Sequence, residues 1–279
     1  MNAYKIVVDS CCELPEKLRS DKRLERVPLS IEVGEYQIQD DESFNQAEFL
    51  RKVAEYPKCP KSSCPSPQRY MEAYHADVER VYVVTLSGKL SGSYNSAELG
   101  KKLYKETYGN KQIYVVDSES ASCGEAQIAM KLMDLEEQGL SFQEIVEKIN
   151  DFRDKMNTYF VLDSLETLRK NGRLSSVKAV VASTLNIKPV MGADHGIIHQ
   201  RGQGIGMKKA LTKMVDIIVS ELHDALEKRV IISHCNAYER AQTVKRLLEG
   251  KISCREILIM DTAGISSLYA NDGGVIVAV

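Results

Sequence analysis

The chain of 279 residues contains no tryptophan, and all its aromatic side chains together make up only 6% of the sequence. Proteins that bind single-stranded nucleic acid stack the bases on aromatic rings, so this scarcity argues against such a function. An excess of one charge is also missing, because 37 Lys and Arg face 39 Asp and Glu, for a net charge of −2. This balance argues against nucleic acid or an anionic membrane surface as the main partner.

Long apolar runs are absent as well, since no segment approaches the roughly 20 apolar residues that a membrane-spanning helix needs. Residues 1–5 lead directly into the first predicted strand, without the basic and apolar regions of a leader peptide. We therefore expect a soluble cytoplasmic protein with no stable membrane insertion.

Disulfide and metal-site patterns are missing too. The seven cysteines are odd in number and include no C-x-x-C pair, which is typical of free buried thiols. Cys59 and Cys64 are close enough in sequence for half of a zinc site, but nothing nearby supplies the other two ligands. We therefore expect no bound metal and no cofactor.

Strands and helices alternate through the first part of the chain. Short apolar runs such as Ile6–Val8, Val81–Val84 and Ile113–Val116 are typical of buried strands. The segment Ser141–Met156 has one apolar face and a capping box at its start, so it predicts a helix. Alternation of this kind predicts a parallel sheet that helices cover on both faces.

The pattern changes beyond residue 160. Asn186–Met191 and Gly196–His199 predict a hairpin, in which Pro189 favours an edge position or the start of a strand. Three helices and three strands make up the rest: Leu165–Asn171, Val177–Leu185, Lys208–Leu226, Arg229–Ser233, Arg255–Met260 and Val275–Val279. We predict an α/β fold of two domains, residues 1–160 with a parallel sheet and residues 161–279 with a mixed or antiparallel sheet.

Three predicted strands end in the same dipeptide, at Asp9-Ser10, Asp117-Ser118 and Asp163-Ser164. Asp and Ser are good helix N-caps, so capping explains part of this pattern. The alternative is that these polar groups gather at the carboxyl edge of one sheet, where open α/β sheets bind ligands.

The segment Thr85–Ala97 is the most informative part of the chain. A buried strand precedes it, a helix follows it, and the residues between are small, polar and rich in serine and glycine. Backbone N–H groups and hydroxyls therefore meet at a helix N-terminus, which favours binding of an anion. Because no strong base lies in the segment, it predicts capture of a carboxylate or phosphate rather than attack on it.

A second serine cluster, Lys61–Pro67, is predicted to be a turn in which Ser66 and Pro67 begin a helix. It could supply a second hydroxyl to the same anion. The glycine-rich run Gly202–Gly206 lacks the spacing of a dinucleotide or P-loop motif, so we predict a flexible hairpin loop there rather than a phosphate site.

An enzyme remains an alternative function. Gly88–Gly92 resembles a nucleophile elbow but has one residue too many before the serine. A serine-dependent acyl hydrolase would use Ser91 as its nucleophile, and His234, at the end of a predicted strand, is its one candidate base.

Seven motifs in this order carry a resemblance to a known family: Asp9–Pro15, Ser62–Pro67, Leu90–Ala97, Val116–Ser118, Leu162–Arg173, Asn186–Pro189 and Lys208–Ala210. Each motif alone is weak, but their order and spacing over nearly the whole chain closely resemble the DegV family of bacterial fatty-acid-binding proteins. The resemblance implies two α/β domains with a long-chain fatty acid between them, its carboxylate in the loops and its tail in an apolar tunnel.

The resemblance also implies a carrier with no catalytic residues of its own, the lipid-binding subunit of a fatty acid kinase. Such a carrier presents the acyl carboxylate to a separate ATP-binding kinase protein. The ligand-binding residues that it implies are Ser62, Ser63, Ser91, Gly92, Ser93, Asn95 and Tyr269. Four positions depart from the family: Ser62 replaces Thr, Cys64 and Asn95 each replace Gln, and Tyr269 falls where the family has a His.

The basic turn formed by Arg169, Lys170 and Arg173 is predicted to contact the kinase partner. The alternative is a solvated helix end, where cations interact favourably with the helix dipole. Hydroxyls and helix N–H groups can hold the carboxylate without a buried Lys or Arg, and such neutral donors leave it nucleophilic.

Overall fold

The structure is a computed structural model that describes residues 4–174 and 186–279. The predicted helix Val177–Leu185 lies outside the described residues. Within them, no helix combines the length and the hydrophobicity that crossing a bilayer requires.

The first sheet contains four parallel strands in the order β2-β1-β6-β7. These strands are β1 (Tyr4–Asp9), β2 (Leu24–Val27), β6 (Arg80–Thr85) and β7 (Gln112–Asp117). Four helices pack on the sheet: α3 (Pro67–Tyr74), α4 (Ser93–Tyr108), α5 (Cys123–Glu137) and α6 (Phe142–Lys155). Alternate strand residues contact α3 and α4 on one face and α5 and α6 on the other, so the predicted parallel sheet with two covered faces is confirmed.

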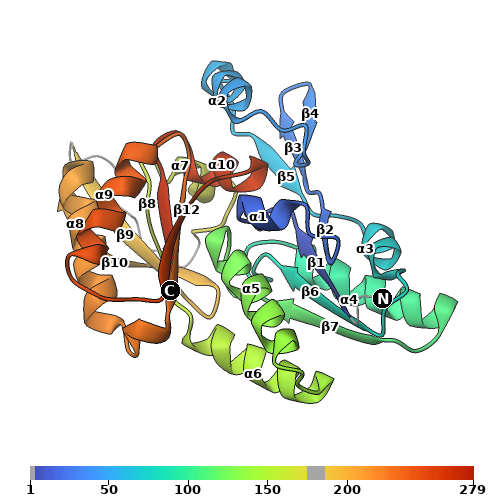
Figure 1. Ribbon diagram of the computed structural model, residues 1–279. Helices are drawn as coiled ribbons and strands as arrows, with labels where there is room; N and C mark the ends of the chain where they lie inside the picture. Colours follow the sequence, from blue (N-terminus) through green and yellow to red (C-terminus); the bar gives the residue numbers. More distant parts are fainter. Residues whose placement is uncertain (1–3, 175–185) are drawn as a thin grey trace.

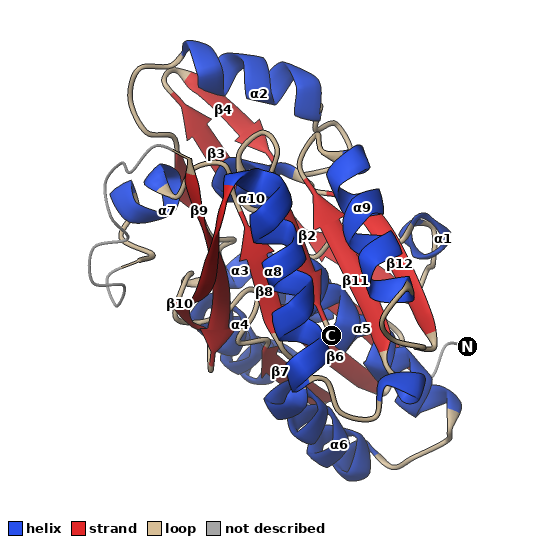
Figure 2. Cartoon of the chain, turned by 90° about the vertical axis from the view of Figure 1, so that its left-hand side faces the viewer, coloured by secondary structure: helices blue, strands red, loops and turns tan. Residues whose placement is uncertain are grey.

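The second sheet contains six strands in the order β10-β9-β8-β13-β11-β12. They are β8 (Thr158–Val161), β9 (Ile187–Asp194), β10 (Ile197–Ile205), β11 (Arg229–His234), β12 (Glu256–Asp261) and β13 (Val275–Ala278). Only β11 and β12 pair in parallel, so the sheet is mixed, as predicted. Two helices, α8 (Gly206–Glu221) and α9 (Tyr238–Glu249), cover its outer face (Figure 2).

Helix α5 lies between the two sheets (Figure 1). Its residues pack against both, and 11 of its 15 residues are buried. The Gln127 side chain donates hydrogen bonds to the carbonyl oxygens of Arg229 and Ala278, at 2.6 and 3.0 Å. A helix enclosed by two layers is expected to be buried on most of its sides, and α5 thereby joins the two halves of the chain.

A third, antiparallel sheet was not predicted. It has the order β4-β3-β5 and carries α2 (Gln46–Glu55) beside it, and its strands are β3 (Ser30–Val33), β4 (Tyr36–Gln39) and β5 (Lys61–Ser63). The serine cluster predicted as a turn therefore begins in a strand, because β5 pairs with β3. The helix that follows at Pro67 is as predicted, with Ser66 as its N-cap.

Helix α10 (Gly264–Ala270), near the end of the chain, contacts this unpredicted part of the fold. The buried Asp40 carboxylate accepts hydrogen bonds from the backbone N–H groups of Gly264 and Ile265, at 2.7 and 2.9 Å. Because α10 joins the two halves in this way, the division into residues 1–160 and 161–279 stays a prediction. Three short helices complete the part of the fold that the structure describes: α1 (Glu16–Arg19), α7 (Glu166–Lys170) and the 3-10 turn η1 (Ala225–Glu227).

The prediction of a flexible loop at Gly202–Gly206 is wrong. Gly202 and Gly204 lie in β10, and Gly206 begins α8. A Cβ atom on Gly204 would lie 2.3 Å from the backbone nitrogen of Ala210, and one on Gly202 would lie 3.1 Å from the side chain of Ile217. The absence of side chains at these glycines therefore lets α8 pack closely against one face of β10.

Candidate functional site

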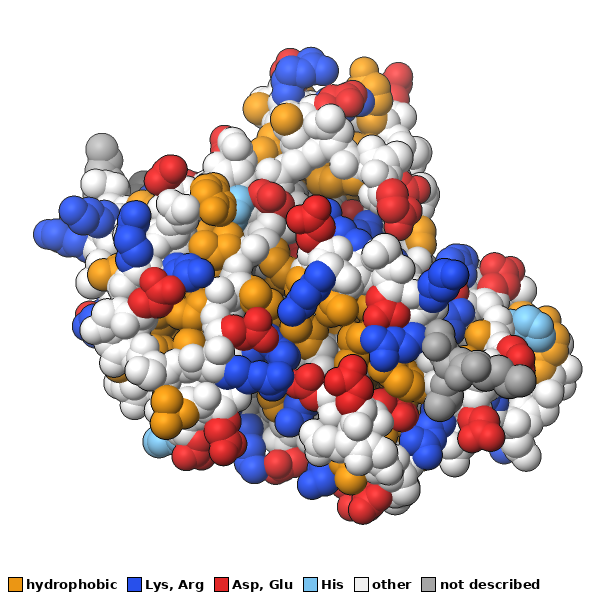
Figure 3. Space-filling model, viewed as in Figure 1, with side chains coloured by type: hydrophobic (Ala, Val, Ile, Leu, Met, Phe, Trp, Pro, Cys, Tyr) orange, Lys and Arg blue, Asp and Glu red, His pale blue; other side chains and the backbone are white. Residues whose placement is uncertain are grey.

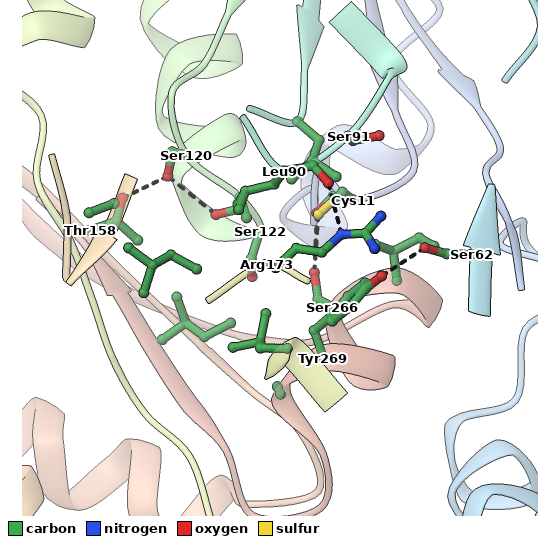
Figure 4. A pocket seen from close by; sticks show the side chains of 18 of the residues that line it. Cys11, Ser62, Leu90, Ser91, Ser120, Ser122, Thr158, Arg173, Ser266 and Tyr269 are labelled. Atoms are coloured by element: carbon green, nitrogen blue, oxygen red, sulfur yellow. Dashed lines mark hydrogen bonds between the residues drawn. The ribbon is translucent and has the colours of Figure 1, made fainter. Parts of the chain in front are cut away.

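A cavity of about 300 Å³ lies where the loops of the first sheet meet the second sheet, β5 and α10 (Figure 4). Most of its wall is apolar, contributed by Leu29, Leu86, Leu90, Phe160, Leu162, Ile198, Ile265 and Ile276. Its volume and its mainly apolar lining are typical of small-molecule sites. The surface seen in Figure 3 mixes positive and negative side chains, with apolar side chains between the two halves.

Three hydroxyl groups gather at one end of the cavity: those of Ser62 on β5, Ser91 before α4, and Tyr269 on α10. Ser62 Oγ lies 2.9 Å from the Tyr269 phenol oxygen, within hydrogen-bonding distance. Ser91 Oγ accepts a hydrogen bond from the backbone N–H of Ser93 at 3.2 Å, which leaves its own hydrogen able to bind a ligand. This end of the cavity can therefore donate to an anion.

A cation lies at the same end. The Arg173 guanidinium lines the cavity, and its Nε donates to the Leu90 carbonyl oxygen at 3.1 Å. Another of its nitrogens donates to the Asn171 carbonyl oxygen. The guanidinium carbon lies 5.8 Å from the centre of the Tyr269 ring, within cation–π range. A carboxylate at this end would therefore meet a positive charge as well as hydroxyls.

Arg169, Lys170 and Arg173 form one basic turn in the sequence, but the structure separates the three side chains. Arg169 is exposed on α7 and pairs with Glu166 at 2.8 Å. Lys170 is exposed as well. Only Arg173 of these three cations lines the cavity. Its role there could not be inferred from spacing, because three cations within five residues look alike in sequence.

The other predicted ligand-binding residues divide in a similar way. Ser63 and Gly92 line the cavity. Ser93 is fully buried outside the lining, and its hydroxyl donates to Asp9 while it accepts from Tyr70. Asn95 is exposed in the first turn of α4 and does not line the cavity. Of these four residues, only Ser63 and Gly92 can therefore touch a ligand in the cavity.

The far end of the cavity, opposite Ser62 and Ser91 in Figure 4, contains Ser120 and Thr158. Their hydroxyl oxygens lie 2.6 Å apart, so they satisfy one another and this end presents little free polarity. Cys11 lines the cavity as well. Burial raises the pKa of its thiol well above the ordinary value, so the thiol stays neutral beside an apolar ligand.

Two of the three strand-end aspartates, Asp9 and Asp117, lie at the carboxyl edge of the first sheet, as one of the two alternatives predicted, and both bind one loop. Asp9 accepts a hydrogen bond from the Leu86 N–H at 2.8 Å, and Asp117 accepts one from the Gly88 N–H at 3.0 Å. They therefore hold the loop that precedes α4 rather than cap their own helices. Asp163 follows a strand of the second sheet and instead pairs with Lys188 and Arg240, so the three do not gather at one edge.

The geometry contradicts the alternative of a Ser91 hydrolase. His234 lies at the end of β11 in a different depression, where its Nδ1 accepts from the Ala237 N–H at 3.2 Å. That depression shares no lining residue with the cavity, and no described residue lining the cavity is a histidine. A general base must come within hydrogen-bond reach of its nucleophile, so His234 cannot serve Ser91.

All seven cysteines are free thiols, as predicted, but Cys59, Cys64 and Cys254 are only partly buried. One cluster has the composition of a metal site, since Glu119, which also lines the cavity, brings a ligand atom within 4.8 Å of those of Asp154 and His195. Arg153 lies 2.7 Å from Asp154 and 3.9 Å from Glu119. The cluster therefore already contains its counter-charge, and it gives no reason to place a cation there.

Comparison with protein families matches residues 3–279 to the family described as "Uncharacterised protein, DegV family COG1307". Among curated proteins, a DegV domain-containing protein of Streptococcus gordonii is 36% identical over 276 residues, which is 98% of this chain and 97% of the relative. One of Streptococcus pyogenes serotype M1 is 33% identical over 276 residues, with 98% of each chain covered.

Solved structures resemble this one over their whole length. A DegV family protein from Ruminococcus gnavus, described with vaccenic acid, shares 51% identity and superposes with a TM-score of 0.97, covering 99% of both chains. The Fatty Acid Kinase (Fak) B3 protein of Streptococcus pneumoniae, loaded with linoleic acid, shares 32% identity with a TM-score of 0.89, covering 99% of this chain and 98% of that one.

Proposed function

Because the chain belongs to the DegV family, we propose that it binds one long-chain fatty acid in the cavity and presents its carboxylate to a separate fatty acid kinase. Two supports for fatty-acid binding are the relative with vaccenic acid, at 51% identity, and the Fak B3 relative with linoleic acid. The observation that carries the proposal is chemical: one cavity combines a mainly apolar wall with an end where three hydroxyls and a guanidinium can donate to an anion.

The apolar wall supplies the binding energy. Burial of an acyl chain contributes about 0.8 kcal/mol for each methylene group. For a chain of about 14 methylenes the gross gain is on the order of 11 kcal/mol, before the cost of ordering the ligand. This energy favours a long chain over a short one, and it needs no specific polar contact along the tail.

The polar end offsets the desolvation cost of the carboxylate, which would otherwise cancel part of this gain. An unpaired carboxylate taken out of water costs several kcal/mol. The Ser91 hydroxyl can donate a hydrogen bond to the carboxylate. Ser62 and Tyr269 have two hydroxyl hydrogens, of which one is shared between them, so the other can also be donated to the carboxylate. Arg173 adds a charge-assisted partner. In this proposal Ser62, Ser91, Tyr269 and Arg173 contact the carboxylate, while Ser63 and Gly92 shape the cavity around it.

Presentation to a kinase needs a surface beside the polar end. Arg169 and Lys170 are exposed on α7, a few residues before Arg173. We assign them to the contact with the kinase protein, where a carboxylate oxygen attacks the terminal phosphorus of ATP and ADP leaves. The carrier supplies no base, because a carboxylate is already ionised near neutral pH. In this proposal residues 1–160 carry the serine-rich binding loops, and residues 161–279 complete the tunnel and add Arg173 and Tyr269 to its polar end.

Native mass spectrometry of freshly purified protein tests the binding. We expect a non-covalent mass addition equal to one long-chain fatty acid, which disappears on denaturation. A covalent acyl adduct on Ser91 would contradict the carrier function. For the second step, the loaded protein, the purified cognate kinase and ATP should yield an acyl phosphate that hydroxylamine traps. Fatty-acid binding without trapped product would support the binding function and contradict the presentation of the carboxylate to the kinase.

A further inference from the structure

The loop that presents Ser91 is tied at both ends to one buried carboxylate, that of Asp9 at the end of β1. Asp9 Oδ2 accepts a hydrogen bond from the Leu86 N–H at 2.8 Å and one from the Ser93 hydroxyl at 2.5 Å. Its other oxygen accepts from the Cys11 N–H at 3.1 Å. Leu86 and Ser93 stand on either side of Ser91, so the position of Asp9 decides where the loop begins and ends.

The connection continues from Asp9 to Ser91 through a single residue. Since the Ser93 hydroxyl donates to Asp9, its oxygen must accept the hydrogen of Tyr70, at 2.6 Å. The backbone N–H of Ser93 in turn donates to Ser91 Oγ at 3.2 Å. Ser91 therefore uses its oxygen as an acceptor within the protein and keeps its hydrogen for the cavity.

We propose that Asp9 is a positioning residue for the fatty-acid head group, which acts through Ser93 and the loop Leu86–Ser93 to aim the Ser91 hydroxyl at the carboxylate. Asp9 does not line the cavity, so it has no direct contact with the ligand. This inference rests on the proposed function, since it concerns how the same site holds its ligand.

The electrostatic environment of Asp9 supports a role beyond a simple tether. Asp9 is fully buried, and its three donors are neutral groups. Burial raises the pKa of this carboxyl above its ordinary value. A neighbouring acid, Glu125, is fully buried as well, and its pKa is raised well above the ordinary value, mainly by burial and then by the charge of Asp9. Burying a carboxylate in such a place lowers the stability of the fold, and an asparagine at this position would avoid that cost.

A double-mutant cycle with two ligands tests the inference. The variants are Asp9→Asn, Ser91→Ala and their combination, and the ligands are vaccenic acid and the alcohol of the same chain. We expect Asp9→Asn to weaken binding of the acid about tenfold. Binding of the alcohol, which carries no charge at its head, should change less than about twofold. In the Ser91→Ala background, Asp9→Asn should weaken acid binding by less than about threefold, because both changes remove the same contact.

A control separates positioning from general stability. Asp163 is also a strand-end aspartate, but it pairs with Lys188 and Arg240 and does not reach the loop. Asp163→Asn should therefore leave the ratio of acid to alcohol affinity unchanged. Equal losses of acid and alcohol affinity in Asp9→Asn, or full additivity with Ser91→Ala, would overturn the inference.

If Asp9→Asn does not fold, Ser93→Ala replaces it in the same cycle, because it removes the hydroxyl that links Asp9 to the loop and keeps the backbone N–H. Additivity of Ser93→Ala with Ser91→Ala then overturns the inference. Wild-type protein that binds no fatty acid overturns the proposed function, whereas wild-type binding with an unchanged affinity ratio in Asp9→Asn overturns the positioning role alone.

Discussion

The Ser62 hydroxyl oxygen lies 2.9 Å from the phenol oxygen of Tyr269, although 207 positions separate the two residues in the sequence. Ser62 belongs to β5 of the three-stranded sheet, and Tyr269 belongs to α10 near the end of the chain. The polar end of the cavity therefore forms only when both halves are folded and docked. Of the two hydroxyl hydrogens, one is used between the residues and the other can be donated to a ligand.

The first prediction concerns Tyr269. Tyr269→Phe removes one neutral hydrogen-bond donor, so we expect fatty-acid affinity to fall by about 1 kcal/mol, roughly fivefold. Tyr269→His should instead add a pH dependence centred near 6.5, the ordinary pKa of histidine, with tighter binding on the acidic side. Titration calorimetry with one fatty acid at several pH values measures both effects. A histidine variant whose pH profile matches that of wild type would show that position 269 does not face the carboxylate.

The second prediction concerns Ser91. Ser91→Ala should weaken fatty-acid binding about tenfold, because a hydrogen bond to a charged group contributes about 1.5–3 kcal/mol. The melting temperature of the ligand-free protein should stay the same, since the Ser91 side chain supports only one internal hydrogen bond. Thr107→Ala, an exposed change at the other end of α4, is the matched control and should leave the affinity unchanged. An unchanged dissociation constant in Ser91→Ala would remove Ser91 from the site.

The third prediction separates the three cations of the basic turn. Arg173→Gln should weaken fatty-acid binding about tenfold, because it removes the guanidinium from the polar end of the cavity. Arg169→Gln should leave fatty-acid affinity unchanged and slow acyl-phosphate formation with the kinase, because its side chain is exposed. Calorimetry and the hydroxylamine trap measure the two properties separately. Loss of fatty-acid affinity in both variants would contradict this division of roles.

Local patterns predicted much of the fold. The buried strands of the first sheet are continuous apolar runs, and the capping box at Ser141 and Glu144 is formed as predicted. The three-stranded sheet was missed because β3, β4 and β5 have only three or four residues each, too few to show a clear alternation. The glycines of β10 were taken for a loop because their use, close packing against α8, depends on a contact that no local pattern reveals.

In the candidate site, too, local features could be predicted from the sequence, whereas contacts between distant segments could not. Serine-rich segments shortly before helix starts are local features, so Ser62 and Ser91 could be proposed from the sequence as candidate ligand-binding residues. The distance between Arg173 and Tyr269 is set by the docking of α7 and α10, which are far apart in the chain. Likewise the family resemblance implied that Ser93 binds the ligand, whereas its side chain points to Asp9. Residue type and spacing can find such a loop, but the direction of each side chain follows from tertiary packing.

The last prediction concerns Glu13, which connects the starts of α5 and α10. Its carboxylate accepts hydrogen bonds from the Ser122 hydroxyl at 2.5 Å and from the Ala263 N–H at 3.1 Å. Burial nonetheless raises the pKa of the Glu13 carboxyl to about 7. Between the ordinary pKa of a glutamate and this value, the folded protein binds more protons than the unfolded chain. The contribution of Glu13 to stability is therefore full at acidic pH and is lost as the pH rises through about 7.

Glu13→Gln should remove this pH dependence, because glutamine is neutral and has nearly the same shape. We expect the free energy of unfolding of wild type to fall by about 2–3 kcal/mol more than that of the variant between pH 5 and pH 8. Urea denaturation of both proteins across this range measures the difference, and Glu35→Gln, an exposed change, is the control that should follow wild type. Parallel pH profiles for wild type and Glu13→Gln would mean that Glu13 is ionised in the folded protein at acidic pH. In that case the two hydrogen bonds that it accepts would outweigh the cost of its burial.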